Sequence, residues 1–190
     1  PGVPRRQVAC IPAGAAVGVP GAGVHTYPAR NFSGTGDRPP GATVKVRNVD
    51  GAIASLASTN EKLTVEAGIV NAAPGAVEVR QVMSGTDVLF CTQLGSHDGD
   101  PCASGKHQHG VTFSPWTLFN RHHPITVRYT LHVPTGVTVD VGTVNGRIAA
   151  QNIGGNVKAE TVNGEGGVST KNGPVNAETA NPPESMEVRD

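Results

Sequence analysis

The chain has 190 residues, and 15 Lys and Arg residues balance 15 Asp and Glu residues, so its formal net charge is zero at pH 7. Because no basic stripe or run of like charges occurs, the sequence predicts no nucleic-acid partner and gives no electrostatic case for an anionic membrane. The 25 Gly, the 15 Pro and the 4% of aromatic residues argue against a helical bundle or a large aromatic-lined pocket. The composition instead predicts one β-rich, turn-rich domain.

The first forty residues differ in composition from the rest of the chain. They hold seven Pro and seven Gly but a single acidic residue, Asp37, and they show neither a helical nor an alternating period. We therefore predict a disordered leader over residues 1–40 and one β domain over residues 41–190. The apolar stretch 13–24 is too short for a membrane helix, so we expect membrane attachment only through segments outside this sequence.

Several segments upstream of residue 134 alternate in the manner of β-strands with one buried face. The longest is 125–133, in which Val127, Tyr129 and Leu131 alternate with Arg128 and other polar residues. Shorter runs of the same kind occupy residues 42–47, 62–67, 77–82 and 87–91. No segment predicts a helix.

The last third of the chain contains an internal repeat. A turn dipeptide recurs every nine residues, as Asn145-Gly146, Gly154-Gly155, Asn163-Gly164, Asn172-Gly173 and Asn181-Pro182. The match tightens at eighteen residues, where Thr143-Val144-Asn145-Gly146 returns as Thr161-Val162-Asn163-Gly164. We infer that eighteen residues form one structural unit.

This spacing predicts stacked β coils. Asn and Gly tolerate a positive φ, so each dipeptide permits a sharp corner, and the residues between two corners suffice for a short strand. Equivalent residues of successive coils then form columns, with Thr143, Thr161 and Thr179 in one and Asn145, Asn163 and Asn181 in another, above an inward core of Ile148, Val157 and Val175. Asp50-Gly51 repeats the same phrase earlier in the chain. The sequence thus predicts an all-β fold, a β-solenoid with 18-residue coils late in the chain, preceded by longer strands.

The ordered combination of Tyr129-Thr130-Leu131-His132-Val133-Pro134-Thr135-Gly136 with the two Thr-Val-Asn-Gly phrases resembles a known group. It is similar to the bacterial putative-adhesin domains, a toast-rack-like family of unknown function, over residues 40–181. The resemblance implies a single-stranded right-handed parallel β-helix. It also implies an extracytoplasmic location in the periplasm, the cell envelope or the cell surface, and it supplies no catalytic residues and no cofactor.

One stretch, residues 91–123, is rich in Cys and His. A metal site would use Cys102, His107 and His109, because thiolate and imidazole ligands suit zinc or copper, although the spacing fits no standard zinc arrangement. The alternative is a disulfide between Cys91 and Cys102, which the extracytoplasmic setting implied by the resemblance makes chemically available.

Three functions follow from these observations. The first is a non-catalytic envelope protein whose Thr-, Asn- and Lys-bearing strands form an adhesin-like binding or structural surface, with an unknown protein or a cell-surface glycan as partner and with self-association through an open edge of the solenoid. The second is a metal-binding envelope protein that uses the Cys- and His-rich loop. The third is a carbohydrate-active enzyme, for which Glu160 and Glu178 align at an interval of eighteen residues.

Overall fold

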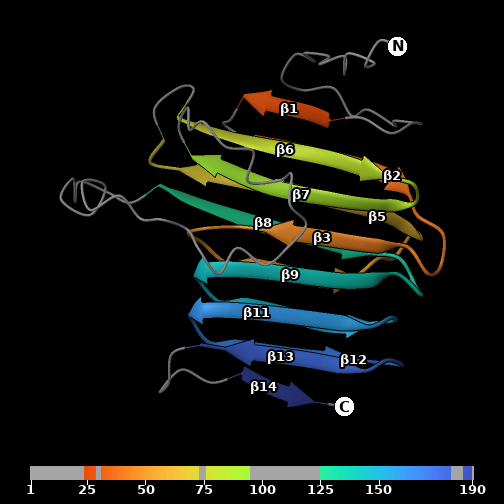
Figure 1. Ribbon diagram of the computed structural model, residues 1–190. Coiled ribbons are helices and arrows are strands. Elements are labelled where there is room, and N and C mark those ends of the chain that lie inside the picture. Colours follow the sequence, from red (N-terminus) through yellow and green to blue (C-terminus); the bar gives the residue numbers. More distant parts are fainter. Residues whose placement is uncertain (1–23, 29–30, 73–75, 95–124, 181–185, 190) are drawn as a thin grey trace, which may run out of the picture.

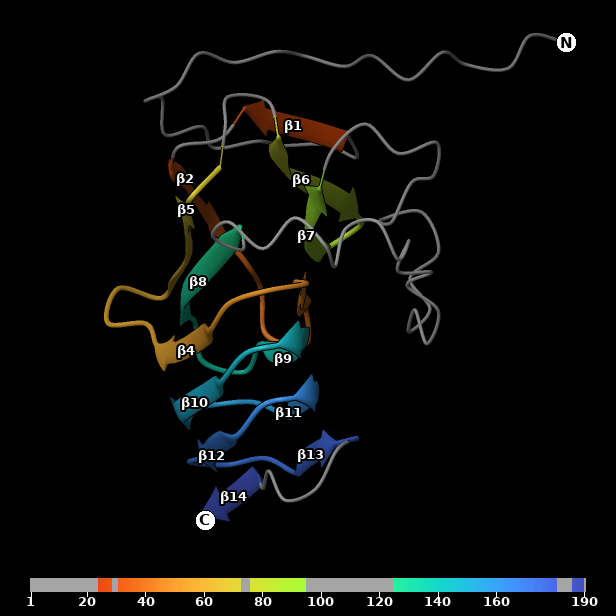
Figure 2. The same cartoon turned by 90° about the vertical axis from the view of Figure 1, so that its left-hand side faces the viewer.

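The computed structural model describes residues 24–28, 31–72, 76–94, 125–180 and 186–189, and every element in these ranges is a β-strand. The strands form two seven-stranded sheets that face each other (Figures 1 and 2). The all-β class predicted from composition is confirmed.

The first sheet, sheet A, has the strand order β1-β6-β7-β3-β9-β11-β13. Five of its strands, from β7 to β13, run parallel to one another, whereas β6 pairs antiparallel with β7 and β1 pairs antiparallel with β6. The strands are β1 (Val24–Pro28), β6 (Val77–Ser84), β7 (Asp87–Leu94), β3 (Thr43–Arg47), β9 (Thr138–Asn145), β11 (Val157–Asn163) and β13 (Val175–Thr179).

The second sheet, sheet B, has the order β14-β12-β10-β4-β8-β5-β2 and the same mixed character. Its strands from β14 to β8 are parallel, and β5 and β2 continue the sheet with antiparallel pairing. The strands are β14 (Met186–Arg189), β12 (Gly166–Thr170), β10 (Ile148–Ile153), β4 (Ile53–Ala57), β8 (Thr126–Val133), β5 (Lys62–Val70) and β2 (Asn31–Asp37).

The fold prediction of a single-stranded right-handed parallel β-helix is wrong, because both sheets are mixed. Hairpins interrupt the alternation between sheets: β6 returns directly into β7 through the tight turn at Gly85, whose φ is 62°. Along the chain, β5 and β6 therefore insert antiparallel strands between β4 and β7, so no single run of coils extends through the whole of the described residues. The nine-residue spacing of turn dipeptides begins at Asn145 and concerns only parallel strands, so it could not predict a hairpin earlier in the chain.

The eighteen-residue spacing is visible in the strand registers at the C-terminal end. Val139 pairs with Val157, and Val157 pairs with Val175, each in a parallel ladder. In sheet B, Ile148 pairs with Gly166. In this part of the molecule the chain passes back and forth between the two sheets (Figure 2).

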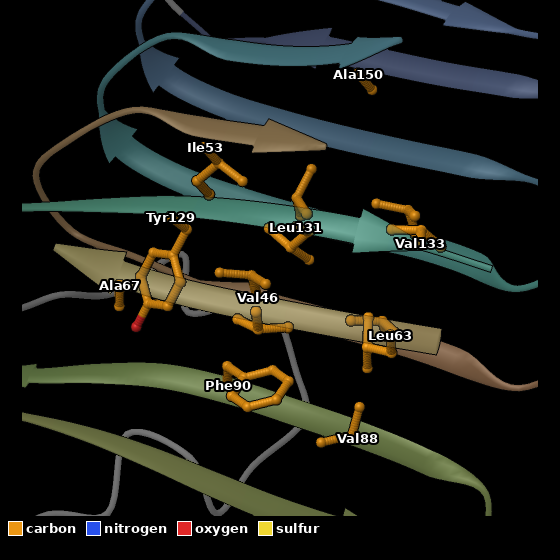
Figure 3. Packing of buried hydrophobic residues seen from close by; sticks show 14 of the residues in the cluster. Val46, Ile53, Leu63, Ala67, Val88, Phe90, Tyr129, Leu131, Val133 and Ala150 are labelled. Carbon is orange, nitrogen blue, oxygen red and sulfur yellow. The ribbon is translucent and has the colours of Figure 1, made fainter. Parts of the chain in front are cut away.

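The core lies between the sheets and consists of small aliphatic side chains at its C-terminal end and larger ones near β2, β7 and β8. Tyr129 and Leu131 of β8 and Val46 of β3 are fully buried and point into the space between the sheets (Figure 3). The rings of Phe32 and Phe90 meet across that space with centroids 5.7 Å apart. Burial of alternate residues along each strand is what the sequence alternation predicts.

The five strands expected upstream of residue 134 are present as β3, β5, β6, β7 and β8. The leader prediction concerned residues 1–40, of which 1–23, 29 and 30 lie outside the described residues. Residues 31–37 form β2, which pairs with β5 and buries Phe32, so this segment contributes to the sheet and its core.

Candidate functional site

The predicted turn residues lie together along one corner between the sheets. Asn145 donates from Nδ2 to Asp50 Oδ1 at 2.7 Å, and Asn163 donates from Nδ2 to Asn145 Oδ1 at 2.8 Å. Asp50 and Asn145 also form a parallel β-bridge. These side chains form a hydrogen-bonded ladder that ties neighbouring strands together, which is a structural role.

The threonine column lies inside the molecule and not on its surface, contrary to the surface that the sequence predicted. Thr143 and Thr161 are 5% and 4% exposed. The Thr161 hydroxyl donates to the carbonyl oxygen of Gly146 at 3.2 Å, and the Thr179 hydroxyl donates to that of Gly164 at 3.4 Å. The hydroxyls thus satisfy corner carbonyls that the strand ladders leave without a partner.

The corner glycines are required mainly by close backbone approach, and not by the positive φ that the sequence suggested. A Cβ on Gly146 would lie 2.2 Å from the carbonyl oxygen of Gly51, and one on Gly164 would lie 2.0 Å from that of Gly146. At the corners near Gly154 and Asn172, Gly155 and Gly173 face carbonyl oxygens in the same way. Among the corner glycines, only Gly51 has a positive φ, of 124°.

A buried chain of polar groups lies where β3, β7 and β8 meet. The Thr92 hydroxyl donates to Asn48 Oδ1 at 3.0 Å and lies 2.8 Å from the Tyr129 hydroxyl, while Asn48 Nδ2 donates to the Val127 carbonyl at 2.8 Å. Burial raises the pKa of Tyr129, and the hydrogen bond to Thr92 only partly opposes that effect. Tyr129 is 1% exposed, so the phenol is a structural group and not an accessible acid.

The outer face of sheet A carries two ion pairs. Arg47 binds both carboxylate oxygens of Asp140, at 2.8 and 2.9 Å. Lys158 Nζ lies 2.8 Å from Glu160 Oε1, and this hydrogen bond raises the pKa of Lys158. Glu178 stands directly beside Glu160 in the β11–β13 ladder, so the two acids considered for an enzyme lie on adjacent strands, with Glu160 held by a lysine.

A shallow groove lies over β10, β12 and β14 on sheet B. Its volume is about 340 Å³, and it is lined by Arg147, Ala149, Ala150, Gln151, Asn152, Gly167, Val168, Ser169 and Glu187. A side chain added at Gly167 would meet no atom within 4 Å, so the groove floor there is open to solvent.

A β-bulge shapes one end of the groove. The β10–β12 register shifts between Ala150 and Ile153, and Asn152 adopts a φ of 56°. The Ser169 hydroxyl accepts a hydrogen bond from the Asn152 backbone N–H at 3.2 Å. Bulges of this kind redirect side chains, and here Gln151 and Asn152 are both exposed beside the groove.

The groove was not predicted from the sequence. Ala149 and Gly167 are eighteen residues apart, and so are Gln151 and Ser169, so the spacing that revealed the corners also carried this signal. The turn, threonine and inward apolar columns and the aligned Glu160 and Glu178 are the features that this spacing predicted. The outward positions of β10 and β12 line the groove, and their small and polar residues give no hydrophobic period that would mark them.

The Cys- and His-rich stretch lies largely outside the described residues, which include neither Cys102 nor His107 nor His109. Cys91 lies in β7 and is 1% exposed. It takes part in a disulfide whose other cysteine lies outside the described residues. The Cys91–Cys102 pairing and the metal site both stay predictions. Within the described ranges, no three His, Cys, Asp or Glu side chains are grouped to hold a metal ion.

Comparison with known proteins assigns no family. No family model and no curated protein matches the chain. A solved structure of a putative cell adhesion protein from Clostridium sporogenes is similar to it with a TM-score of 0.43 and 9% identity, over 85% of this chain and 98% of that chain. A likeness this weak supports no argument about function. In the part of the chain that the structure describes, no helix is long and apolar enough to cross a membrane.

Proposed function

We propose that this protein is a non-catalytic, adhesin-like binding protein that acts outside the cytoplasm, and that the groove on sheet B holds its partner. The observation that carries the proposal is the groove itself, an outward depression of about 340 Å³ on an otherwise strand-covered face. It combines a floor of small residues with polar side chains at its rim.

The chemistry of the rim suits an extended polar ligand. Arg147 supplies a guanidinium group, Gln151 and Asn152 supply amides, and Glu187 supplies a carboxylate. Such groups hydrogen-bond to sugar hydroxyls or to a peptide backbone, so a cell-surface glycan and an extended protein segment are the two partner classes. A shallow site of this kind favours recognition over catalysis, which needs groups held together away from water.

The carboxylates on sheet A support a structural role for that face. Asp140 is bound by Arg47 through both oxygens, and Glu160 is bound by Lys158. Both carboxylates are thus engaged by cations of the same face, and neither lines the groove on sheet B.

A groove-filling variant with a matched control tests the proposal. Gly167→Tyr places a ring on the groove floor, and Gly68→Tyr places one on β5 of the same sheet, where an added Cβ also meets no atom within 4 Å. Fluorescently labelled wild-type protein and both variants are applied to a glycan array, to intact bacteria and to surface-immobilised extracellular proteins.

We expect wild type and Gly68→Tyr to bind the same ligand and Gly167→Tyr to lose at least about tenfold in affinity, because the ring occupies the ligand volume. Equal binding by all three proteins would place the binding surface elsewhere. Turnover of an arrayed glycan by wild type would contradict the non-catalytic role.

A further inference from the structure

The C-terminal end of the molecule exposes the edge of sheet A. Among the described strands none lies beyond β13 in that sheet. The Val157 N–H donates to the Pro174 carbonyl, and the Ala180 N–H donates to the Thr161 carbonyl. In a parallel ladder, every second residue of a strand turns its N–H and C=O groups to one neighbour. In β13 these residues are Asn176 and Glu178, so the N–H and C=O groups of Val175, Ala177 and Thr179 point away from β11.

The core is also open at this end. In β11 the inward side chains of Val157 and Ala159 are 2% and 0% exposed, whereas their counterparts in β13, Val175 and Ala177, are only partly buried. In sheet B, Val188 of β14 is 47% exposed, although Val168 beside it in β12 is 2% exposed. Among the described residues, the last strand of each sheet thus has no neighbour of the kind that buries the strands before it.

β13 is short and carries the outward Glu178, but it lacks the stronger features that protect a free edge. The strand reads Val-Asn-Ala-Glu-Thr, with no proline, no lysine and no inward charge, and its pairing with β11 is regular over all five residues. Natural sheets commonly protect free edges with such features or cover them with another segment. The edge of β13 is therefore suited to accept a strand.

The two free edges complement each other in a second copy. β13 and β14 lie at the same end of the molecule and run in opposite directions (Figure 1). Rotation about a two-fold axis parallel to the strands keeps the direction of each strand and places sheet A of one copy below sheet B of the other. Because β13 and β14 run in opposite directions, β14 of one copy then lies antiparallel to β13 of the other. By symmetry, the same pairing forms a second time between the two remaining edges. The zero net charge of the chain sets no long-range repulsion against this contact.

We infer that a second copy of this chain covers the open end, with β13 of each copy paired to β14 of the other. The contact joins the two cores and removes Val175, Ala177 and Val188 from water. Because the strands have five and four residues, the contact is small and the dimer is weak. This inference does not rest on the groove or its ligand.

Sedimentation equilibrium of the full chain, from micromolar to near-millimolar concentration, is the first test. We expect a species of twice the 19.4 kDa chain mass to appear as concentration rises. Hydrogen exchange at the same concentrations is expected to slow at the Val175, Ala177 and Thr179 amides. A chain that stays monomeric throughout overturns the inference.

Variants identify the surface. Val188→Asp points a charge inward at the edge and is expected to weaken dimerisation by more than about tenfold. Val70→Asp, at a valine of similar exposure (43%) on β5, is the control and is expected to leave dimerisation unchanged. Ala177→Pro removes an edge-facing N–H without removing a bond to β11 and is expected to act like Val188→Asp.

Circular dichroism and thermal melts establish that each variant is folded. If Ala177→Pro unfolds, Val188→Asp and the exchange data decide alone. A dimer that persists in Val188→Asp, or one that Val70→Asp disrupts equally, overturns the inference, as does concentration-dependent protection confined to other strands.

Discussion

The corner glycines allow the sharpest test of how this fold is held together. Gly146 lies between two neighbouring corners, and an added Cβ would lie 2.2 Å from the Gly51 carbonyl oxygen and 2.6 Å from its carbon. Gly146→Ala therefore forces the corner away from its neighbour by about 1 Å, since a carbon and an oxygen do not approach within about 3 Å without repulsion.

The magnitude follows from what this displacement breaks. The Gly146 N–H donates to the Asn163 carbonyl at 3.1 Å, and the Gly51 N–H donates to the Asn145 carbonyl at 2.8 Å. Two backbone hydrogen bonds contribute about 1 kcal/mol each, and overpacking adds about 1–3 kcal/mol. We expect Gly146→Ala to lower the free energy of unfolding by about 3–5 kcal/mol.

Gly167→Ala is the matched control, because the same methyl group there meets no atom within 4 Å. Within a strand, alanine is expected to be neutral or to stabilise by about 0.5 kcal/mol, since glycine loses more chain entropy on folding. Urea unfolding followed by circular dichroism measures both free energies. If Gly146→Ala costs no more than Gly167→Ala, close approach is not why glycine occupies the corners.

The remaining predictions concern the interior and the cysteines. Burial raises the pKa of Tyr129 above its ordinary 10.0, so the unfolded chain loses the phenolic proton first; stability is fully present below pH 10 and declines as pH rises above it, and urea unfolding up to about pH 11 should show this decline in wild type but not in Tyr129→Phe. Ser55 is fully buried and its hydroxyl has no hydrogen-bond partner among the described residues, so Ser55→Ala should raise the melting temperature, with a gain of about 1 kcal/mol; a loss of that size would reveal a partner. Asn145→Ala removes two ladder hydrogen bonds and should cost about 1–3 kcal/mol in the same urea assay, and an unchanged midpoint would show that the ladder adds no stability. Alkylation before and after reduction, read by mass spectrometry, should find Cys91 linked to Cys102, whereas labelling of both without reduction would exclude the bond.

Much of the local structure could be predicted from the sequence. Alternation in residues 125–133 predicted β8 with Val127, Tyr129 and Leu131 inside, and the structure confirms it. The spacing of Asn145 and Asn163 predicted that they stand beside each other, and they share a hydrogen bond. The first prediction depends on alternation within one strand, which fixes the side-chain direction, and the second depends on the eighteen-residue spacing that sets β9 and β11 in register.

The candidate site was harder to predict, because it consists of outward side chains from strands that are neighbours only after folding. Glu187 of β14 and Arg147, which precedes β10, line the same groove, although β12 lies between their strands in the sheet. Its floor exists because Ala149 and Gly167 are small, and small residues produce no periodic hydrophobic signal. The bulge at Asn152 arises from the pairing of two strands, and an isolated Asn within β10 does not by itself predict it.

The sequence by itself determined the all-β class, the position of the strands and the columns of equivalent residues at the C-terminal end, because periodicity and turn chemistry act over a few residues. Tertiary structure alone decided that the sheets are mixed, since tight hairpins such as the one at Gly85 return the chain antiparallel, whatever repeat follows later. It also decided which side chains serve the fold. The threonines face inward to bind corner carbonyls, while outward residues of β10, β12 and β14 line the groove, because only the stacking of strands distant in sequence creates an inside and an outside.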